Sequence, residues 1–331
     1  MTQPTQYQVL DADRVLTNLS IANMSDMSGF VAGRVFPTVP VNLQASKFKT
    51  YKSGDFDRTE MRITADGSPA PLTGFGYGED NYFCDTYKLG AVVGNATIAN
   101  ASSPLQPLQE TTMLLTRQAM IFREEKFYDT YIKQGVWATD AQGVASGATG
   151  NQFVQFSDYT NSDPIAVMAD RMVQFSLLNA GTKANKLLIT RDVFNVLKNH
   201  PSIIERIIYI AGSEPAIINE RHLSALFEVE VMVLDAVRNT ALEGVDASYA
   251  FFKENAMLLL YAAPTAGLMT DSAGFIFSWT AFSGYGGSVI KREDRRLEQG
   301  GGKYLEIEQA WDMKLRNANM GMFFYDVIAT A

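Results

Sequence analysis

The chain has 331 residues, 47% of them hydrophobic, and a formal net charge of −8 at pH 7. This length can bury a large core in two or three domains. No long Lys/Arg cluster is present, which argues against direct binding to a nucleic-acid backbone. The single cysteine, Cys84, excludes an intrachain disulfide framework and a cysteine-based zinc finger. The N-terminus lacks the pattern of a secretory signal, and Lys253, Glu254 and Pro264 break the most apolar window, so no membrane span is predicted.

The first 46 residues are predicted to form a short helix followed by an extended arm. Asp11 is a candidate cap for a helix that would carry Leu16. The stretch around Pro37 alternates Gly and Pro with apolar residues, and the residue before a proline disfavours helix. Phe30 and Phe36 on this arm need a surface to cover them. That surface is either the body of the same domain or a neighbouring subunit.

Residues 47–100 are predicted to form strands with a long polar excursion between them. Residues 47–56 alternate in a strand-like way, and the Asp66-Gly67 pair is typical of a tight turn. Long excursions from compact domains are usually functional or disordered. The alternation argues against complete disorder here.

A helix is predicted over 107–137, with Pro107 in its first turn and Gly135 at its exit. At about 1.5 Å per residue, its roughly 27 residues give a rod of about 40 Å. Both a scaffolding rod and an ordinary long core helix fit this pattern. The expected apolar stripe consists of Met113, Leu114, Met120, Ile121, Phe127, Tyr128 and Tyr131, and the expected polar face of Arg117, Glu124, Glu125, Asp129 and Lys133.

Residues 155–290 are predicted to form a compact α/β module. A helix follows Asp163-Pro164, and short buried strands are expected at 186–190, 229–236 and 256–262. Thr190 is a candidate cap for a helix that stops at His200-Pro201. The Ser202 to Glu205 spacing matches a capping box.

The C-terminal segment, 291–331, is predicted to form long hairpin strands with one wet face. Its densest charge run, 291–298, suits either a solvated strand face or a complementary surface between subunits. The candidate contacts within it are Arg292, Glu293, Asp294 and Arg295.

No sequence motif for catalysis or cofactor binding is present. The Gly-rich stretches lack phosphate-loop spacing. His200 is expected at a helix terminus and His222 partly exposed, without metal spacing. Cys84 is expected to be a buried thiol. No catalytic, cofactor or metal residue is therefore predicted, although spacing alone leaves open a carboxylate pair brought together from distant segments.

The order of these parts resembles the major capsid proteins of tailed bacteriophages, whose fold is named after phage Hong Kong 97. FVAGRVFPTVPV followed by KFKTYKSGDFDR is similar to their N-terminal arm running into the E-loop. LITRDVFNVLKNHPSIIERI and LSALFEVEVMVLDAVRNTA are similar to their A-domain.

The resemblance implies an α+β capsid fold with an N-arm (1–46), an E-loop lying over a neighbouring subunit (47–100), and a P-domain (101–154) whose spine helix is 107–137. An A-domain (155–290) and C-terminal strands that complete the P-domain (291–331) would follow. Expected inter-subunit contacts are Phe30, Phe36, Arg58, Arg62, Asp66, Arg123, Glu124 and the four residues of the charge run.

The implied function is structural: pentamers and hexamers of the chain would build an icosahedral shell in the host cytoplasm around phage double-stranded DNA, without sequence-specific binding. A separate scaffold protein is expected, because the chain reaches its arm within about 25 residues. Portal and decoration proteins are further expected partners. Lys47, Lys49 and Lys52 lie near the base of the E-loop, but nothing in the sequence identifies a crosslinking partner for them, so no crosslink is predicted. The alternatives are an encapsulin shell subunit and, from another class, a soluble hydrolase built on distant carboxylates.

Overall fold

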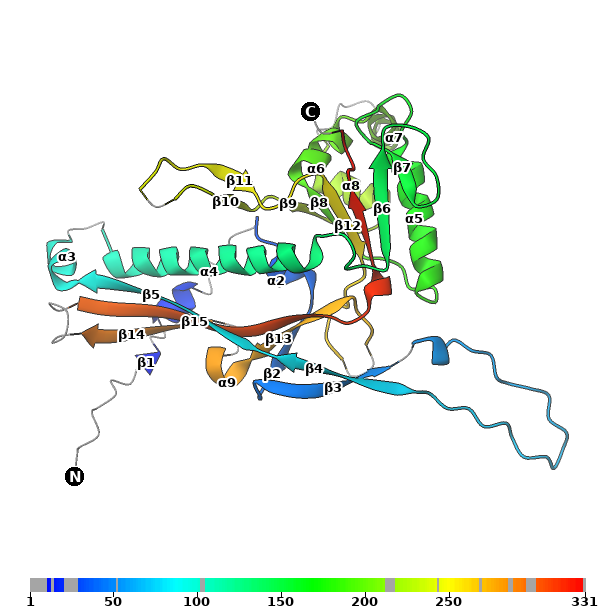
Figure 1. Cartoon of the computed structure of the whole chain (residues 1–331), viewed down its shortest axis with the longest axis horizontal. Helices are drawn as coiled ribbons and strands as arrows, with labels where there is room; N and C mark the ends of the chain where they lie inside the picture. Colours follow the sequence, from blue (N-terminus) through cyan, green and yellow to red (C-terminus); the bar gives the residue numbers. More distant parts are fainter. Residues whose placement is uncertain are drawn as a thin grey trace.

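The computed structural model describes residues 11–12, 15–20, 29–51, 53–101, 105–211, 218–242, 244–267, 270–284, 288–295 and 302–329. These residues form an α+β fold with two larger sheets and two separate hairpins. In Figure 1 the long helix α4 runs beside the long strand β15, and the second sheet stands with its helices at the upper right. A long loop leaves the body at the lower right.

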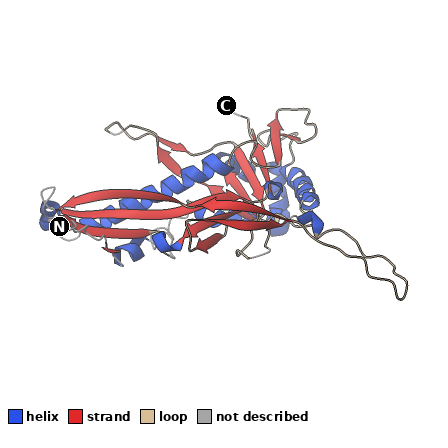
Figure 2. Cartoon of the chain, turned by 60° about the horizontal axis from the view of Figure 1, so that its bottom comes forward, coloured by secondary structure: helices blue, strands red, loops and turns tan. Residues whose placement is uncertain are grey.

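The first sheet is built around β15. Residues 305–311 of this strand are all buried, so the wet face predicted for it is wrong over this stretch. One edge of β15 pairs with β5, and its other edge is shared end to end by β14 and β13. Figure 2 shows these long strands lying side by side. The sheet consists of β1 (Asp11–Ala12), β2 (Thr38–Val41), β5 (Asp85–Gly94), β13 (Gly274–Trp279), β14 (Val289–Arg295) and β15 (Gly302–Leu315).

The second sheet has the order β7-β6-β16-β12-β8-β9. Its central strand, β12, is buried along its whole length, which explains its continuous apolar sequence. The strands are β6 (Thr139–Val144), β7 (Gln152–Val154), β8 (Lys186–Thr190), β9 (Glu230–Leu234), β12 (Ala256–Leu260) and β16 (Gly321–Tyr325). The accompanying helices are α5 (Pro164–Leu178), α6 (Arg191–Lys198), α7 (Pro201–Ala211) and α8 (Glu220–Phe227).

The two sheets exchange strands in a way that the sequence did not indicate. The last strand, β16, was expected beside the long helix, but it pairs with β12 and β6 in the second sheet. Strand β13, expected in the α/β module, pairs with β15 and β2 in the first sheet. Strand pairing between distant segments depends on partners that periodicity does not reveal, so both corrections concern topology rather than the existence of strands.

The remaining elements connect or extend these sheets. Strands β3 (Ala45–Tyr51) and β4 (Tyr77–Phe83) pair antiparallel, as do β10 (Val237–Asn239) and β11 (Tyr249–Phe251). The short helices are α2 (Ala32–Val35), α3 (Asn95–Asn100), α9 (Thr280–Ser283), a turn of helix at 15–20, and the 3-10 turns Ser53–Asp55 and Ala318–Met320.

Helix α4 spans Pro107–Tyr131 and is therefore shorter than the predicted 107–137. The indole Nε1–H of Trp137 donates a 2.8 Å hydrogen bond to the carbonyl of Tyr131. This bond satisfies one of the carbonyls that every helix end leaves free, and it requires the chain to turn back. Gly135, with φ of 77°, supplies part of that reversal.

The buried face of α4 also differs from the predicted stripe. Met113 and Leu114 are exposed in the first half of the helix, where Thr112, Leu115 and Thr116 are buried instead. The hydroxyl groups of both threonines donate to carbonyls one turn earlier, so they are buried without losing hydrogen bonds. In the second half, Phe127, Tyr128 and Tyr131 are buried as predicted.

The start of α7 is capped differently from the prediction. The helix begins at Pro201, one residue before the expected cap, Ser202. His200 lies just outside it, and its Nδ1 accepts a 3.3 Å hydrogen bond from the backbone N–H of Ser202. The predicted terminal role of His200 is confirmed, but the Ser202 to Glu205 capping box is wrong. Thr190 precedes α6 as expected, yet its hydroxyl donates to the carbonyl of Ala256 rather than capping the helix.

Candidate assembly surfaces

The loop between β3 and β4, residues 53–76, exposes large apolar side chains. Met61, Ile63 and Leu72 are 94%, 106% and 97% exposed. The loop reverses where predicted, since Ser68 N–H donates to the Ala65 carbonyl at 3.1 Å and Gly67 has φ of 82°. Three almost fully hydrated apolar side chains on one projecting segment indicate a surface that another molecule covers.

The two arms of this long loop are held together at its base by aromatic and polar contacts. The ring centroids of Phe56 and Phe75 lie 5.1 Å apart, and Tyr51 lies 5.9 Å from Phe75. Asp55 accepts from the Gly76 N–H at 3.0 Å and pairs with Arg58 at 3.5 Å. The base of the loop is therefore closed by its own contacts. Arg58, Arg62 and Asp66 are all on it, and their role as inter-subunit contacts stays a prediction.

The arm segment 29–36 folds onto its own chain. Phe36 is buried, with its ring centroid 5.0 Å from that of Tyr131 and 6.1 Å from that of Phe127. The prediction of Phe36 as an inter-subunit contact is therefore wrong, because α4 already covers it. Phe30 is half-buried, and its contact with a neighbour stays a prediction.

Glu124 is also internal to the chain, contrary to its predicted role at a subunit contact. It is 1% exposed, and its Oε1 accepts a 2.6 Å hydrogen bond from the backbone N–H of Ala32 at the start of α2. Burial raises the pKa of Glu124 to about 7, against the opposing effects of the Ala32 and Val31 N–H groups and of Arg123 and Arg34. The carboxyl group thus anchors the arm to the long helix.

Arg123 lies beside Glu124 and is half-buried. Its guanidinium group lies 5.8 Å from the ring centroid of Trp311 and also lies beside Gly33 of the arm. It therefore fills the junction of arm, long helix and β15. A contact from Arg123 to a neighbouring subunit stays a prediction.

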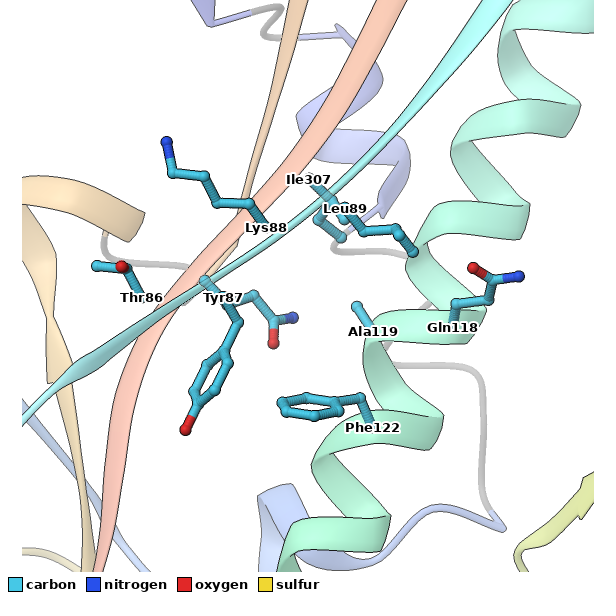
Figure 3. Close-up of a pocket in the computed structure, with 9 residues that line it drawn as sticks. Thr86, Tyr87, Lys88, Leu89, Gln118, Ala119, Phe122 and Ile307 are labelled. Atoms are coloured by element: carbon cyan, nitrogen blue, oxygen red, sulfur yellow. The ribbon is translucent and has the colours of Figure 1, made fainter.

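A groove of about 380 Å³ runs between β5 and α4. Figure 3 shows Leu89 and Ile307 from the strands facing Ala119 and Phe122 from the helix, whereas Lys88 points away. One end is closed by aromatic rings, because Tyr87 lies 4.8 Å from Phe122. The groove is mainly apolar and partly open to solvent, so it has the character of a binding surface rather than of an enclosed site.

A buried charge cluster lies on the first sheet, and the sequence analysis missed it. Glu308 is fully buried on β15 and forms ion pairs with Lys88 on β5 and Lys291 on β14. Burial raises the pKa of Glu308, but hydrogen bonds and charge attraction from the two lysines outweigh that effect, so the net pKa is lowered. Only the strand register brings these groups together, and the one available signal was alternation of Glu with apolar residues.

The predicted contacts Arg292, Glu293, Asp294 and Arg295 lie on β14, with their backbone paired to Gly302–Leu305 of β15. Their side chains fall outside the described part of the structure. Their role as inter-subunit contacts therefore stays a prediction.

His200 and Cys84, the side chains considered above as candidates for chemistry, are both buried. His200 is buried, with Nε2 3.0 Å from the Ser162 hydroxyl oxygen, and burial lowers its pKa. Cys84 is buried as predicted, and burial raises the pKa of its thiol to about 11. Among the described residues, no cluster of three or more His, Cys, Asp or Glu side chains is suited to a metal ion. No helix among them is long and apolar enough to cross a membrane.

Comparison with known proteins identifies the fold. No family model and no curated protein sequence matches the chain. Among solved structures, a phage-related protein from Bordetella bronchiseptica RB50 is 18% identical, with a TM-score of 0.70 over 98% of this chain and 100% of that one. The capsid of cyanophage P-SCSP1u is 9% identical (TM-score 0.53, 100% and 94% coverage), and the mature capsid of bacteriophage PhiM1 is 8% identical (0.52, 88% and 84%). The chain therefore has the α+β capsid-protein fold of tailed phages, the Hong Kong 97 fold.

Proposed function

We propose that this protein is the major capsid protein of a tailed phage, assembling as pentamers and hexamers into an icosahedral shell around double-stranded DNA. The observation that carries the proposal is the long loop, which presents Met61, Ile63 and Leu72 to solvent from a fixed base. In a single copy these apolar side chains stay in contact with water, which is unfavourable. In a shell where each copy covers the loop of the next, the same side chains would be buried.

The groove between β5 and α4 is the surface we assign to the loop of a neighbouring copy. The loop leaves the body at the end of the molecule opposite to α3 (Figure 1), whereas the groove lies beside the middle of α4. Each arm of the loop has about a dozen residues, which at about 3.3 Å per residue reaches roughly 40 Å. That reach is enough to extend over part of a neighbouring subunit, and the apolar walls of the groove match the apolar side chains of the loop.

The parts of the fold then take the roles that the family resemblance implies. Residues 1–46 would be the N-arm, 47–100 the E-loop, and α4 the spine helix of the P-domain. The module with the second sheet would be the A-domain. The net charge of −8 suits an inner wall along which DNA moves without adhering. The shell would form in the host cytoplasm with separate scaffold, portal and decoration proteins, and no enzymatic role is proposed.

Electron microscopy of the purified protein, alone and co-expressed with a neighbouring scaffold gene, tests the proposal. Closed shells or capsomer rings are the expected result. Only monomers under every condition would contradict it. Shells that enclose a cargo enzyme rather than DNA would instead indicate an encapsulin, which shares the capsid function but not the phage role.

A further inference from the structure

A second apolar projection leaves the body from the module with the second sheet. Strands β10 and β11 form a hairpin whose described residues, 237–242 and 244–251, expose Leu242, Val245 and Tyr249 at 81%, 65% and 71%. Figure 1 shows this hairpin extending to the left of the module, above α4. With about seven residues a side, it reaches roughly 20 Å from its base. Within the described chain nothing covers these three side chains.

The hairpin is ordered by its own hydrogen bonds up to its tip. Thr240 N–H donates to the Ser248 carbonyl at 2.8 Å, and Oδ1 of Asn239 accepts from Ser248 N–H at 3.0 Å. At the tip, Val245 N–H donates to the Leu242 carbonyl at 3.2 Å. The projection therefore presents its apolar side chains in a fixed arrangement, which lowers the entropic cost of docking.

The base of the hairpin is fixed to the long helix. Arg238 forms an ion pair with Glu125 of α4, and its guanidinium group lies 5.3 Å from the ring centroid of Phe252. Phe252 in turn stacks on Tyr128 of α4, with ring centroids 5.2 Å apart. These contacts set the direction in which the hairpin points relative to the rest of the subunit.

An apolar groove lies on the other side of the same module, between α5 and α8. Its volume is about 460 Å³, and Met168 and Phe227 are buried beneath it. Val173 and Leu177, one turn apart on α5, line it and are 61% and 79% exposed. In Figure 1 α5 is on the right of the module and the β10–β11 hairpin is on its left. One subunit therefore cannot place its own hairpin in its own groove.

We propose that the β10–β11 hairpin of one copy docks in the α5–α8 groove of the next copy. A projecting hairpin and an exposed groove on opposite sides of one subunit give a heterologous contact between copies. Such contacts generate a ring when the rotation that relates neighbouring copies closes on itself. The groove is lined by one exposed lysine, Lys183, and one exposed glutamate, Glu228, so exposed Asp246 near the hairpin tip has one lysine there with which it can pair. The inference rests on the proposed shell function and adds to it the specific contact that joins neighbouring modules.

The test uses cysteine pairs in the full chain, because Cys84 is buried and leaves the background unreactive. Assembled particles of Leu177→Cys/Val245→Cys, treated with a short bismaleimide, should give a ladder of covalent multimers up to the ring size. Each single-cysteine variant serves as the control and should give no ladder. Particles that assemble but show no ladder overturn this contact and leave the shell function standing. If no particles form from the wild-type chain under any condition, the shell function fails and this contact fails with it.

A second variant separates docking from folding. Leu177→Asp changes an exposed side chain, so its unfolding transition should match that of the wild type, and its ring or shell yield should fall at least about tenfold, equivalent to about 1.4 kcal/mol. Val245→Asp should have the same effect from the other partner. A normal shell yield from either variant would refute the contact.

Discussion

The backbone N–H of Ala32 donates a 2.6 Å hydrogen bond to Oε1 of Glu124, although 92 positions separate the two residues. The carboxyl group is buried, and its pKa is raised from 4.5 to about 7, first by burial. The folded state therefore holds a proton between pH 4.5 and 7 that the unfolded state releases. Stability from this group is highest below pH 4.5, and it is lost as the pH rises to about 7.

Glu124→Gln should remove this pH dependence, because the amide oxygen still accepts from Ala32 but does not titrate in this range. Relative to this variant, the wild type should lose at most about 3 kcal/mol of unfolding free energy between pH 5 and pH 8. Urea unfolding of dissociated subunits at both pH values measures the difference. A constant gap in unfolding free energy between the two proteins would show that burial does not raise the pKa of Glu124.

Replacing the buried carboxylate of Glu308 should affect stability in the opposite pH direction. Glu308→Gln leaves Lys291 without its buried counter-charge and Lys88 with only Glu306, 3.5 Å away, which should cost about 2–4 kcal/mol at pH 7. Because the pKa of Glu308 is lowered, its contribution is fully present above its unfolded pKa of about 4.5 and is lost as the pH falls through the lower folded value. The difference in unfolding free energy between Glu308→Gln and the wild type should therefore become smaller at acidic pH.

The control for Glu308 is the exposed pair of Lys47 and Glu79, whose charged atoms lie 3.2 Å apart. Glu79→Gln should cost less than about 1 kcal/mol, since water screens exposed ion pairs. Equal effects from both glutamate variants would mean that the three-strand cluster contributes no more than a surface contact does.

The fold class and most elements could be predicted from the sequence, because they depend on local signals. The buried strand at 186–190, the turn at Asp66-Gly67 and the terminal position of His200 all follow from period, turn chemistry or the adjacent proline. The order of the arm, the long loop, the long helix and the α/β module along the chain also predicts the capsid fold without any knowledge of sheet pairing.

What the sequence could not predict depends on long-range partners. Glu124 reads as surface by helical period, yet the free backbone N–H groups of a short arm helix make it a buried anchor. Glu308 follows the alternation of β15, but its lysine partners come from β5 and β14 only through register. The placement of β16 was wrong for the same reason. Its apolar sequence fits either sheet, and the sequence does not indicate that it pairs with β12 and β6.

The arm contains a matched pair of aromatic residues that differ in burial. Phe36→Ala should destabilise the subunit by about 3–5 kcal/mol, because it leaves a cavity against Phe127 and Tyr131. Phe30→Ala removes a half-buried ring and should cost clearly less. Urea unfolding of dissociated subunits measures both. A larger effect at Phe30 would mean that the arm is not packed on α4 as described.

The long loop provides the sharpest separation of stability from assembly. Ile63→Asp alters a fully exposed side chain, so the free energy of unfolding of the subunit should change by less than about 0.5 kcal/mol. Shell yield by electron microscopy should nevertheless fall strongly, because a charge would enter the apolar groove of the neighbouring copy. Thr64→Asp places the same charge one residue away on an exposed polar position and is the matched control.

If Thr64→Asp impairs assembly as much as Ile63→Asp does, the loop acts through its net charge. If neither variant impairs assembly, the loop does not bury its apolar side chains on a neighbour.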